Sequence, residues 1–270
     1  MPSPDGRPDD AYTFGTSATA AARLALLAEV YEPGSRALLG RWCPPSPEHA
    51  VDLGCGPGHT TRLLHEVSRA GRTTGVERAP AFVATARATA PAGVTIVEAD
   101  VTHDPLPVDD ADVVHARFLV THLAAPRSAV RLWGDLLRPG GRLVLQEVAR
   151  LVSREPALGR YYELVAELQQ HHGQALDVGA TLERIAVDAV APGTGLAVEH
   201  VAIRGWRPPV AAMATLHVLN LRTWRGDAFA ARAFDPDELD ALDEALGEIA
   251  HGRPTEPIEQ DLAEVVIARG

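Results

Sequence analysis

The first half of the chain alternates between short apolar runs and stretches in which apolar residues recur every three or four positions. The intervening periodicity predicts helices over residues 59–70, 80–90 and 126–137, the last closed by Pro139-Gly140-Gly141. The apolar runs predict five strands, which are uninterrupted enough for a parallel sheet covered on both faces. These strands lie at residues 50–53, 73–77, 94–99, 111–116 and 141–148. The alternation predicts a doubly wound α/β sheet.

The pattern weakens toward the beginning of the chain. Residues 1–10 contain almost no apolar side chains, and we expect them to form a loose tail. Leu24 and Tyr31 then lie on a predicted helix that Pro33-Gly34 should end, before a second short helix that reaches Trp42. We therefore expect residues 1–45 to form a tail and lid helices, ahead of a core at residues 46–150.

Residues 151–270 should supply substrate-capping helices and the last strands of the sheet. Apolar residues that begin at Leu158 and at Leu182 predict two amphipathic helices. Asp235-Pro236-Asp237-Glu238 is typical of a helix start, with an acidic cap followed by Pro. We expect further strands at residues 198–204 and 263–270, the second at an edge of the sheet.

The amino-acid composition excludes several classes of function. The 270 residues are 46% hydrophobic and 23% charged, which excludes a disordered or fibrous chain. The 25 basic residues are all Arg, and the lack of Lys excludes a Walker-type phosphate loop and a pyridoxal Schiff base. The net charge of −11 opposes nucleic-acid binding, and we expect neither a signal peptide nor a membrane span. With two cysteines only, we expect a cytoplasmic protein that binds a small molecule.

The most informative segment is Val51-Asp52-Leu53-Gly54-Cys55-Gly56-Pro57-Gly58, between a predicted strand and a predicted helix. Glycines here let the backbone turn sharply against a ligand, whose anionic end can meet the helix N-terminus. Glu77 ends the next strand, where a carboxylate can accept hydrogen bonds from two ribose hydroxyls. Asp100 ends the third strand and could accept one from the amine of adenine. A solvated Glu and a turn-forming Asp are the ordinary alternatives, but three such signals at successive strand ends favour a binding site.

From Tyr12 to Glu147 the sequence resembles the class I S-adenosylmethionine-dependent methyltransferases. The resemblance is carried by VDLGCGPG, GVER, EADV, DVVHARFLVTHL and LLRPGGRLVLQEV. It implies S-adenosylmethionine as cofactor and a Rossmann-like, mostly parallel seven-stranded sheet, with a helical lid from N-terminal and C-terminal insertions. In the family, the glycine turn wraps the methionine part, the acid matching Glu77 holds the ribose, and the acid matching Asp100 lies at the adenine.

The resemblance also implies a set of cofactor-binding residues. The segment from Tyr12 through Arg23-Leu24 is similar to a lid helix whose residues close over the methionine end. The full set is Tyr12, Arg23, Asp52, Gly54, Cys55, Gly56, Pro57, Gly58, Glu77, Arg78, Asp100, Val101, Arg117 and Phe118.

Two other functions remain as alternatives. An NAD-dependent oxidoreductase uses a similar sheet, but its GxGxxG spacing would place Gly where this chain has His59, and a Tyr-x-x-x-Lys pair requires the missing Lys. The other alternative is a non-catalytic protein that keeps the cofactor fold. An intact glycine turn argues for cofactor binding and leaves the chemistry open.

Motifs that are missing after the fourth predicted strand exclude several classes of methyl acceptor. DNA amino-methyltransferases carry an Asp/Asn-Pro-Pro-aromatic motif after the fourth strand, where this chain has Ala116-Arg117-Phe118-Leu119. Neither Cys43 nor Cys55 could serve as the nucleophile of a cytosine-C5 enzyme. Residues 116–123 contain no acid, so we predict no metal site of the catechol-enzyme type. We expect transfer to O, N or C of a small metabolite, from specialised metabolism by the resemblance, and leave a homodimer open.

His122 is our leading candidate for a catalytic general base, because its loop follows the fourth strand beside the expected methyl group. Packing or cofactor contact is the alternative role for His122. Glu147, at the end of the fifth strand, is the second candidate, and either residue could instead orient the substrate. We expect His171-His172 to be polar residues on the protein surface rather than metal ligands, because adjacent helical side chains point in different directions. Pocket lining and ordinary core are both open for Trp206, Met213, His217, Trp224 and Phe229.

Overall fold

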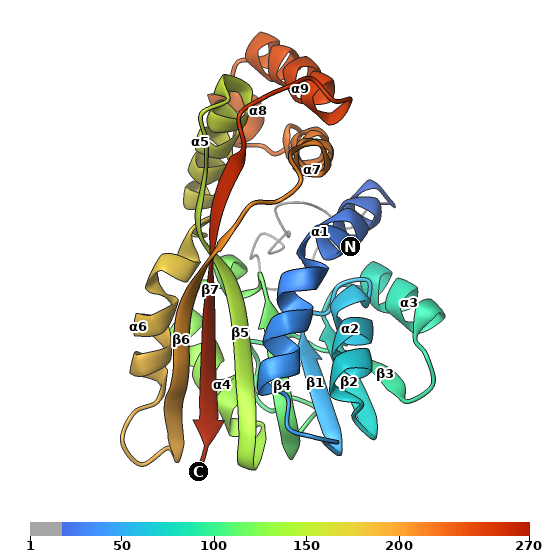
Figure 1. Ribbon diagram of the computed structural model, residues 1–270, viewed down its shortest axis with the longest axis vertical. Helices are drawn as coiled ribbons and strands as arrows, with labels where there is room; N and C mark the ends of the chain where they lie inside the picture. The colour runs from blue at the N-terminus through green and yellow to red at the C-terminus, as the bar shows by residue number, and fades with distance from the viewer. Residues whose placement is uncertain (1–17) are drawn as a thin grey trace, which may run out of the picture.

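The computed structural model describes the backbone of residues 18–270 and the side chains of residues 20–270. Its sheet has seven strands in the order β3-β2-β1-β4-β5-β7-β6, as Figure 1 shows. The five strands β3, β2, β1, β4 and β5 are all parallel to their neighbours in this order, whereas β7 runs antiparallel to both β5 and β6. The strands are β1 (His49–Leu53), β2 (Arg72–Glu77), β3 (Val94–Glu98), β4 (Ala111–Arg117), β5 (Leu137–Ser153), β6 (Leu196–Trp206) and β7 (Ile258–Arg269).

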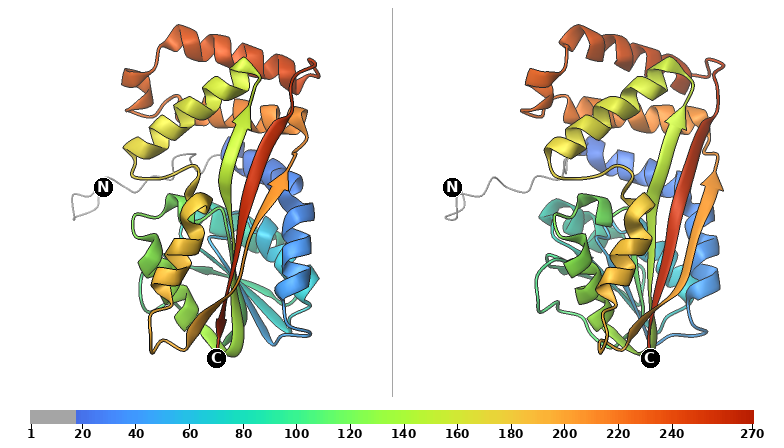
Figure 2. Two further views of the ribbon diagram at one scale, coloured as in Figure 1. Left: turned by 60° about the vertical axis from the view of Figure 1, so that its left-hand side comes forward. Right: turned by 90° about the vertical axis from the view of Figure 1, so that its left-hand side faces the viewer.

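Helices cover both faces of this sheet. One face packs against α4 (Pro126–Asp135) and α6 (Leu182–Ala189), and the other against α2 (His59–Ser68) and the second half of α1 (Ala18–Trp42). Figure 2 shows α4 and α6 on the side of the sheet opposite α1. α3 (Pro80–Thr89) follows β2, and short 3₁₀ turns η1 (Val120–His122) and η2 (Val178–Thr181) lie beyond β4 and before α6. The sequence prediction of a doubly wound α/β fold is confirmed.

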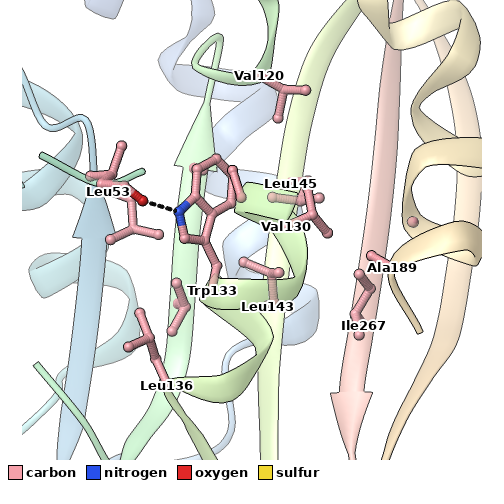
Figure 3. Close-up of a cluster of buried hydrophobic side chains, with 14 of the residues drawn as sticks. Leu53, Val120, Val130, Trp133, Leu136, Leu143, Leu145, Ala189 and Ile267 are labelled. Atoms are coloured by element: carbon pink, nitrogen blue, oxygen red, sulfur yellow. Dashed lines mark hydrogen bonds between the residues drawn. The ribbon is translucent and has the colours of Figure 1, made fainter. Parts of the chain in front are cut away.

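The largest buried side chain on the α4 face also fixes a loop at the sheet edge. Trp133 is fully buried and lies with Val130 and Leu145 in the cluster that Figure 3 shows. Its Nε1 donates a hydrogen bond to the Val101 carbonyl oxygen at 2.9 Å. A hydrogen bond of this kind stabilises a buried indole N–H, so the core holds the loop after β3, which carries Asp100.

A second group of helices forms a lid beyond the carboxyl ends of the parallel strands (Figure 1). It contains α5 (Pro156–His171), α7 (Val210–Trp224), α8 (Ala230–Ala233) and α9 (Pro236–Ala250), with α1 contributing Val30 and Tyr31. These helices share one apolar cluster, separate from the clusters on the two faces of the sheet. The lid therefore has its own core, and α1 contributes to both the lid and the sheet.

Three details differ from the sequence prediction. α1 continues through Pro33, with a visible change of direction, because its two halves are held by different cores (Figure 1). β7 is an interior strand whose residues Ala263 to Ile267 are buried, whereas residues 263–270 were expected at an edge. Pro139-Gly140-Gly141 lies within β5 and causes a register shift against β4. The helix start at Asp235 is confirmed, since its side chain accepts from Asp237 N at 3.0 Å.

Candidate functional site

A cavity of about 1250 Å³ lies between the carboxyl ends of the strands and the lid. Its floor comes from the loops after β1, β2, β3 and β4, and its roof from α1, α5 and α7. In an open α/β sheet this edge is the usual place for a ligand, because the loops there all converge. The cavity unites most of the residues that the sequence predicts for cofactor binding.

The glycine turn after β1 presents backbone to this cavity. Gly54, Gly56 and Gly58 have φ values of 63°, 52° and 89°, in the left-handed region that favours glycine. A Cβ on Gly54 would lie 2.6 Å from Leu119 Cδ1, and one on Gly58 would lie 3.1 Å from Ala86 Cβ. Gly54, Cys55, Gly56 and Pro57 line the cavity, while Gly58 begins α2 behind them. The turn thus brings the chain close to a ligand without side-chain bulk.

Glu77 joins the end of β2 to this turn. Its Oε2 accepts a hydrogen bond from Gly56 N at 2.9 Å, and its Oε1 accepts one from Ala79 N at 2.8 Å. The side chain is 9% exposed and lines the cavity. Because each carboxylate oxygen can accept more than one hydrogen bond, Glu77 keeps acceptor capacity toward a ligand.

Asp52 faces away from the cavity. Its Oδ2 accepts from Thr60 Oγ1 at 2.6 Å and from Thr61 Oγ1 at 2.8 Å, and its Oδ1 lies 3.0 Å from His115 Nδ1. Asp52 and His115 are 1% and 0% exposed. This buried network ties β1 to the first turn of α2 and to β4, so Asp52 acts on the site through the shape of the glycine turn.

Asp100 and Arg78 lie at the adjacent edge of the cavity. Asp100 Oδ1 accepts from Thr102 N at 2.8 Å and from Thr102 Oγ1 at 2.7 Å, while Arg78 Nη1 lies 3.7 Å from Asp100 Oδ2. Burial acts to raise the pKa of Asp100, but these hydrogen bonds and the charges of His103 and Arg78 lower it further than burial raises it. Asp100 is therefore an anion at neutral pH. Val101 also lines the cavity.

Arg117 and Phe118 end β4 under α1. Arg117 Nη1 donates to Ser35 Oγ at 3.1 Å, and burial lowers the pKa of Arg117 to about 10, which leaves it charged at neutral pH. Phe118 adopts a φ of 52°, and its ring meets that of Tyr31 edge to face with centroids 4.8 Å apart. Arg117, Phe118 and Tyr31 all line the cavity. The unusual backbone of Phe118 turns the chain toward η1.

Glu147 holds η1 in place from the end of β5. Its Oε1 accepts hydrogen bonds from Leu119 N and Val120 N, both at 2.7 Å. Its Oε2 has no hydrogen-bond partner among the residues that the structure describes. The side chain is 1% exposed, and burial raises the pKa of Glu147 to about 8 despite the backbone hydrogen bonds. Glu147 is thus largely protonated at pH 7.

His122 is the last residue of η1 and lines the same cavity. Burial lowers the pKa of His122 to about 4, although a hydrogen bond with Gln174 acts in the opposite direction. His122 is therefore neutral at pH 7 and has a nitrogen that can accept a proton. Glu147 and His122 are connected through η1, because the carboxyl group of Glu147 holds the turn that ends at His122.

Three residues predicted for cofactor binding remain to be placed. Arg23 is buried and lines the cavity from α1. Burial raises the pKa of the Cys55 thiol, so this cysteine is uncharged. Tyr12 lies outside the described residues.

No group of His, Cys, Asp or Glu between residues 20 and 270 could hold a metal ion, and no helix in that range could cross a membrane.

The lid contributes residues that the sequence analysis left open or missed. Met213, His217 and Trp224 line the cavity, whereas Trp206 and Phe229 do not. Tyr161, Asn220 and Gln260 line it as well and were not predicted. No motif marks them, because they converge from α5, α7 and β7. His171 stacks on Phe229, His172 Nε2 lies 3.2 Å from Asp227 Oδ2, and both exposed histidines line the cavity.

A glycine turn, two strand-end carboxylates and a lid over one cavity define a nucleotide-binding class of α/β enzyme. The family model for the methyltransferase domain matches residues 51–145. Trans-aconitate 2-methyltransferase of Acidovorax sp. (strain JS42) is 31% identical over 179 residues, which cover 65% of this chain and 69% of the relative. The chain belongs to the class I S-adenosylmethionine-dependent methyltransferases. It is an enzyme with S-adenosylmethionine as cofactor, which rejects both alternatives left open by the sequence.

Solved structures share this fold at low identity. Phosphoethanolamine N-methyltransferase 2 of Haemonchus contortus, in complex with phosphomonomethylethanolamine and S-adenosylhomocysteine, matches with a TM-score of 0.54 and 16% identity over 92% of this chain and 57% of that chain. Geranyl diphosphate methyltransferase in complex with S-adenosylmethionine matches with a TM-score of 0.53 and 15% identity, over 98% of this chain and 93% of that chain. Both comparisons concern the fold.

The residues around the cavity fit this cofactor. A carboxylate with spare acceptor capacity, Glu77, suits a ribose diol, and a Cβ at Gly54 would disrupt the turn beside it. Asp100 offers an anionic acceptor at the neighbouring strand end. Arg23 and Arg117 bring cations to the α1 side, where a carboxylate group can bind.

Proposed function

We propose that this enzyme transfers a methyl group to O, N or C of a small-molecule acceptor in specialised metabolism. The observation that carries the proposal is the single cavity, which extends from the glycine turn and Glu77 to side chains of α5 and α7. One end suits the cofactor and the other can hold an acceptor. The same proposal includes a cytoplasmic location and no nucleic-acid or membrane partner, supported by the net charge of −11.

The cofactor site follows the order of the strand ends. We assign Glu77 to the ribose, Asp100 with Val101 to the adenine, and the turn from Gly54 to Gly58 to the methionine part. Arg23, Tyr12, Arg117 and Phe118 are assigned to the methionine end, and Arg78 orients Asp100 across 3.7 Å. Asp52 and Cys55 act through the conformation of the turn. The contacts that support these assignments are those of Glu77 with Gly56 N and of Asp52 with α2.

When bound, S-adenosylmethionine supplies a methyl group on a sulfonium, ready for direct displacement. The protein's part is to align the acceptor with that methyl group and to exclude water. The lid supports exclusion, because Tyr31, Tyr161 and Trp224 are almost completely buried above the cavity. Alignment depends on the loop that Glu147 fixes through Leu119 N and Val120 N.

We assign His122 as the proton acceptor for acceptors that must lose a proton. Its cavity-lining position at the end of η1 supports this role, while its pKa of about 4 makes it a weak base that suits only an acceptor proton that is readily lost. Glu147 is assigned as a positioning residue, because its Oε1 holds η1 and its pKa of about 8 keeps it mostly protonated at pH 7. His122→Asn should therefore lower the methylation rate without changing affinity for S-adenosylhomocysteine.

Three measurements test the function. Calorimetry with S-adenosylhomocysteine should give heat of binding, and fluorescence titration with NADH should show none. Turnover of methyl-labelled S-adenosylmethionine against a metabolite extract should then label a small acceptor. Absence of binding at high micromolar S-adenosylhomocysteine would contradict the cofactor site. Binding without any labelled product, across extracts, would contradict methyl transfer to a metabolite.

A further inference from the structure

Three polar side chains meet in the lid half of the cavity. Tyr161 comes from α5, and His217 and Asn220 lie one turn apart on α7. The Tyr161 and His217 rings stack with centroids 4.3 Å apart and an angle of 25° between their planes. The three residues are 2%, 3% and 8% exposed, and all of them line the cavity.

Each of these side chains has a buried atom without a hydrogen-bond partner among the described residues: Tyr161 OH, His217 Nδ1 and Asn220 Oδ1. The Tyr161 hydroxyl lies near Asn220 and Trp224 without the geometry of a hydrogen bond. His217 Nε2 is engaged with Tyr162 OH at 3.1 Å, which fixes the ring and leaves Nδ1 as the remaining polar atom. Buried polar atoms without partners are costly, and the presence of three such atoms in side chains that line the same part of the cavity points to a polar ligand group there.

The charges around this group are as informative as its polar atoms. Burial lowers the pKa of His217 to about 3, so its ring is neutral. Among cavity-lining residues of the described lid segments 151–260, Asp227 is the single carboxylate, and no Arg occurs. Asp227 already accepts from Phe229 N and Ala230 N and faces His172. Arg23, Arg78 and Arg117 line the cavity from α1 and the strand ends, on the side proposed for the cofactor.

We propose that Tyr161, His217 and Asn220 form the acceptor-binding point, and that it takes a hydroxyl or carbonyl oxygen of an uncharged, largely apolar molecule. Beside these three side chains the wall includes the apolar Val165, Met213 and Leu216, and the indole of Trp224, whose Nε1 also lacks a hydrogen-bond partner among the described residues. A polycarboxylate such as trans-aconitate would meet no Arg from segments 151–260 at this wall, and the cation whose charge reaches Tyr161 is Arg23 of α1, which we assign to the methionine end of the cofactor. The inference deepens the proposed methyl transfer and rests on it.

Binding of three related probes tests the acceptor class. We would titrate 2-naphthol, its methyl ether 2-methoxynaphthalene and the anion 3-hydroxy-2-naphthoate into the full chain saturated with S-adenosylhomocysteine. Trans-aconitate serves as a fourth ligand. We expect 2-naphthol to bind at least tenfold more tightly than the two anions and several-fold more tightly than its methyl ether. Tyr161→Phe and His217→Phe should each remove most of the preference for the hydroxyl over the ether.

The controls separate this inference from the proposed function. Tyr161→Phe removes an oxygen without a partner, so its melting temperature should equal or exceed that of the wild type, and affinity for S-adenosylhomocysteine should be unchanged. Leu216→Met changes the same wall without changing a polar group and should keep the preference. Tighter binding of either anion, no binding of any neutral probe, or an unchanged preference in Tyr161→Phe would overturn the inference. Loss of S-adenosylhomocysteine binding in the wild type would instead overturn the proposed function.

Discussion

Glu77 Oε2 accepts a hydrogen bond from the backbone N–H of Gly56 at 2.9 Å. One carboxylate thereby ties the end of β2 to the centre of the glycine turn, while its other oxygen accepts from Ala79 N at 2.8 Å. The residue assigned to the ribose therefore also sets the shape of the turn assigned to the methionine part. Cofactor recognition and turn geometry are coupled through a single side chain.

Glu77→Ala should weaken S-adenosylhomocysteine binding by about tenfold or more, because a charge-assisted hydrogen bond contributes roughly 1.5–3 kcal/mol. Calorimetry measures the change directly. Glu98→Ala is the matched control, since Glu98 pairs with Glu77 in the sheet register but is exposed and does not line the cavity. Equal losses in the two variants would show that charge alone, and not the contacts of Glu77, determines affinity.

Gly54→Ala should lower both stability and cofactor affinity. The left-handed φ of 63° costs a non-glycine residue about 1–2 kcal/mol, and the new Cβ would meet Leu119 Cδ1 at 2.6 Å. Urea denaturation and calorimetry report the two effects. Gly40→Ala serves as the control, because this exposed α1 position has nothing within 4 Å of an added Cβ. That variant should gain about 0.5–1 kcal/mol from helix propensity. A stable, tightly binding Gly54→Ala protein would contradict the role of the turn.

Glu147→Gln should change how stability depends on pH. The pKa of Glu147 rises from 4.5 to about 8 on folding, so the folded protein keeps a proton that the unfolded chain loses between these values. The wild type therefore loses stability as pH rises from about 4.5 to 8, by an amount on the order of a few kcal/mol, and then levels off. Gln cannot ionise, and the variant should lack this decline. Denaturation curves from pH 5 to pH 9 provide the measurement, and parallel curves for both proteins would count against the buried acid.

The sequence predicts the part of the site that follows local chain order. The first five strands are short runs that the sequence pattern marks, and Glu77 at the end of β2 and Asp100 just after β3 reach the cavity because parallel strands share one carboxyl edge. The position of residues 263–270 in the sheet could not be inferred from the sequence. β7 lies between β6 and β5, and its partner residues in β5 are more than a hundred positions earlier in the chain. Pairing of that kind leaves no local signal.

The sequence predicts a helical lid, but it leaves open which lid side chains line the cavity, for a different physical reason. Most of α7, up to Leu221, is uncharged and buried on most sides, so its apolar residues show no helical stripe. Tyr161 and His217 meet only after α5 and α7 pack together, which spacing within either helix cannot reveal. α1 runs through Pro33 because contacts with two separate cores outweigh one lost backbone hydrogen bond.

Asp52 provides the sharpest test of indirect action on the cofactor site. Asp52→Ala would leave Thr61 and His115, both fully buried, without their shared partner, and should cost about 3–5 kcal/mol of stability. Asp52→Asn keeps one oxygen acceptor and should lose less. If Asp52 acts only by holding α2 and β4 around the turn, the Asn variant, measured well below its melting temperature, should bind S-adenosylhomocysteine within about threefold of the wild type. A loss of tenfold or more in that folded variant would instead require direct contact between Asp52 and the ligand.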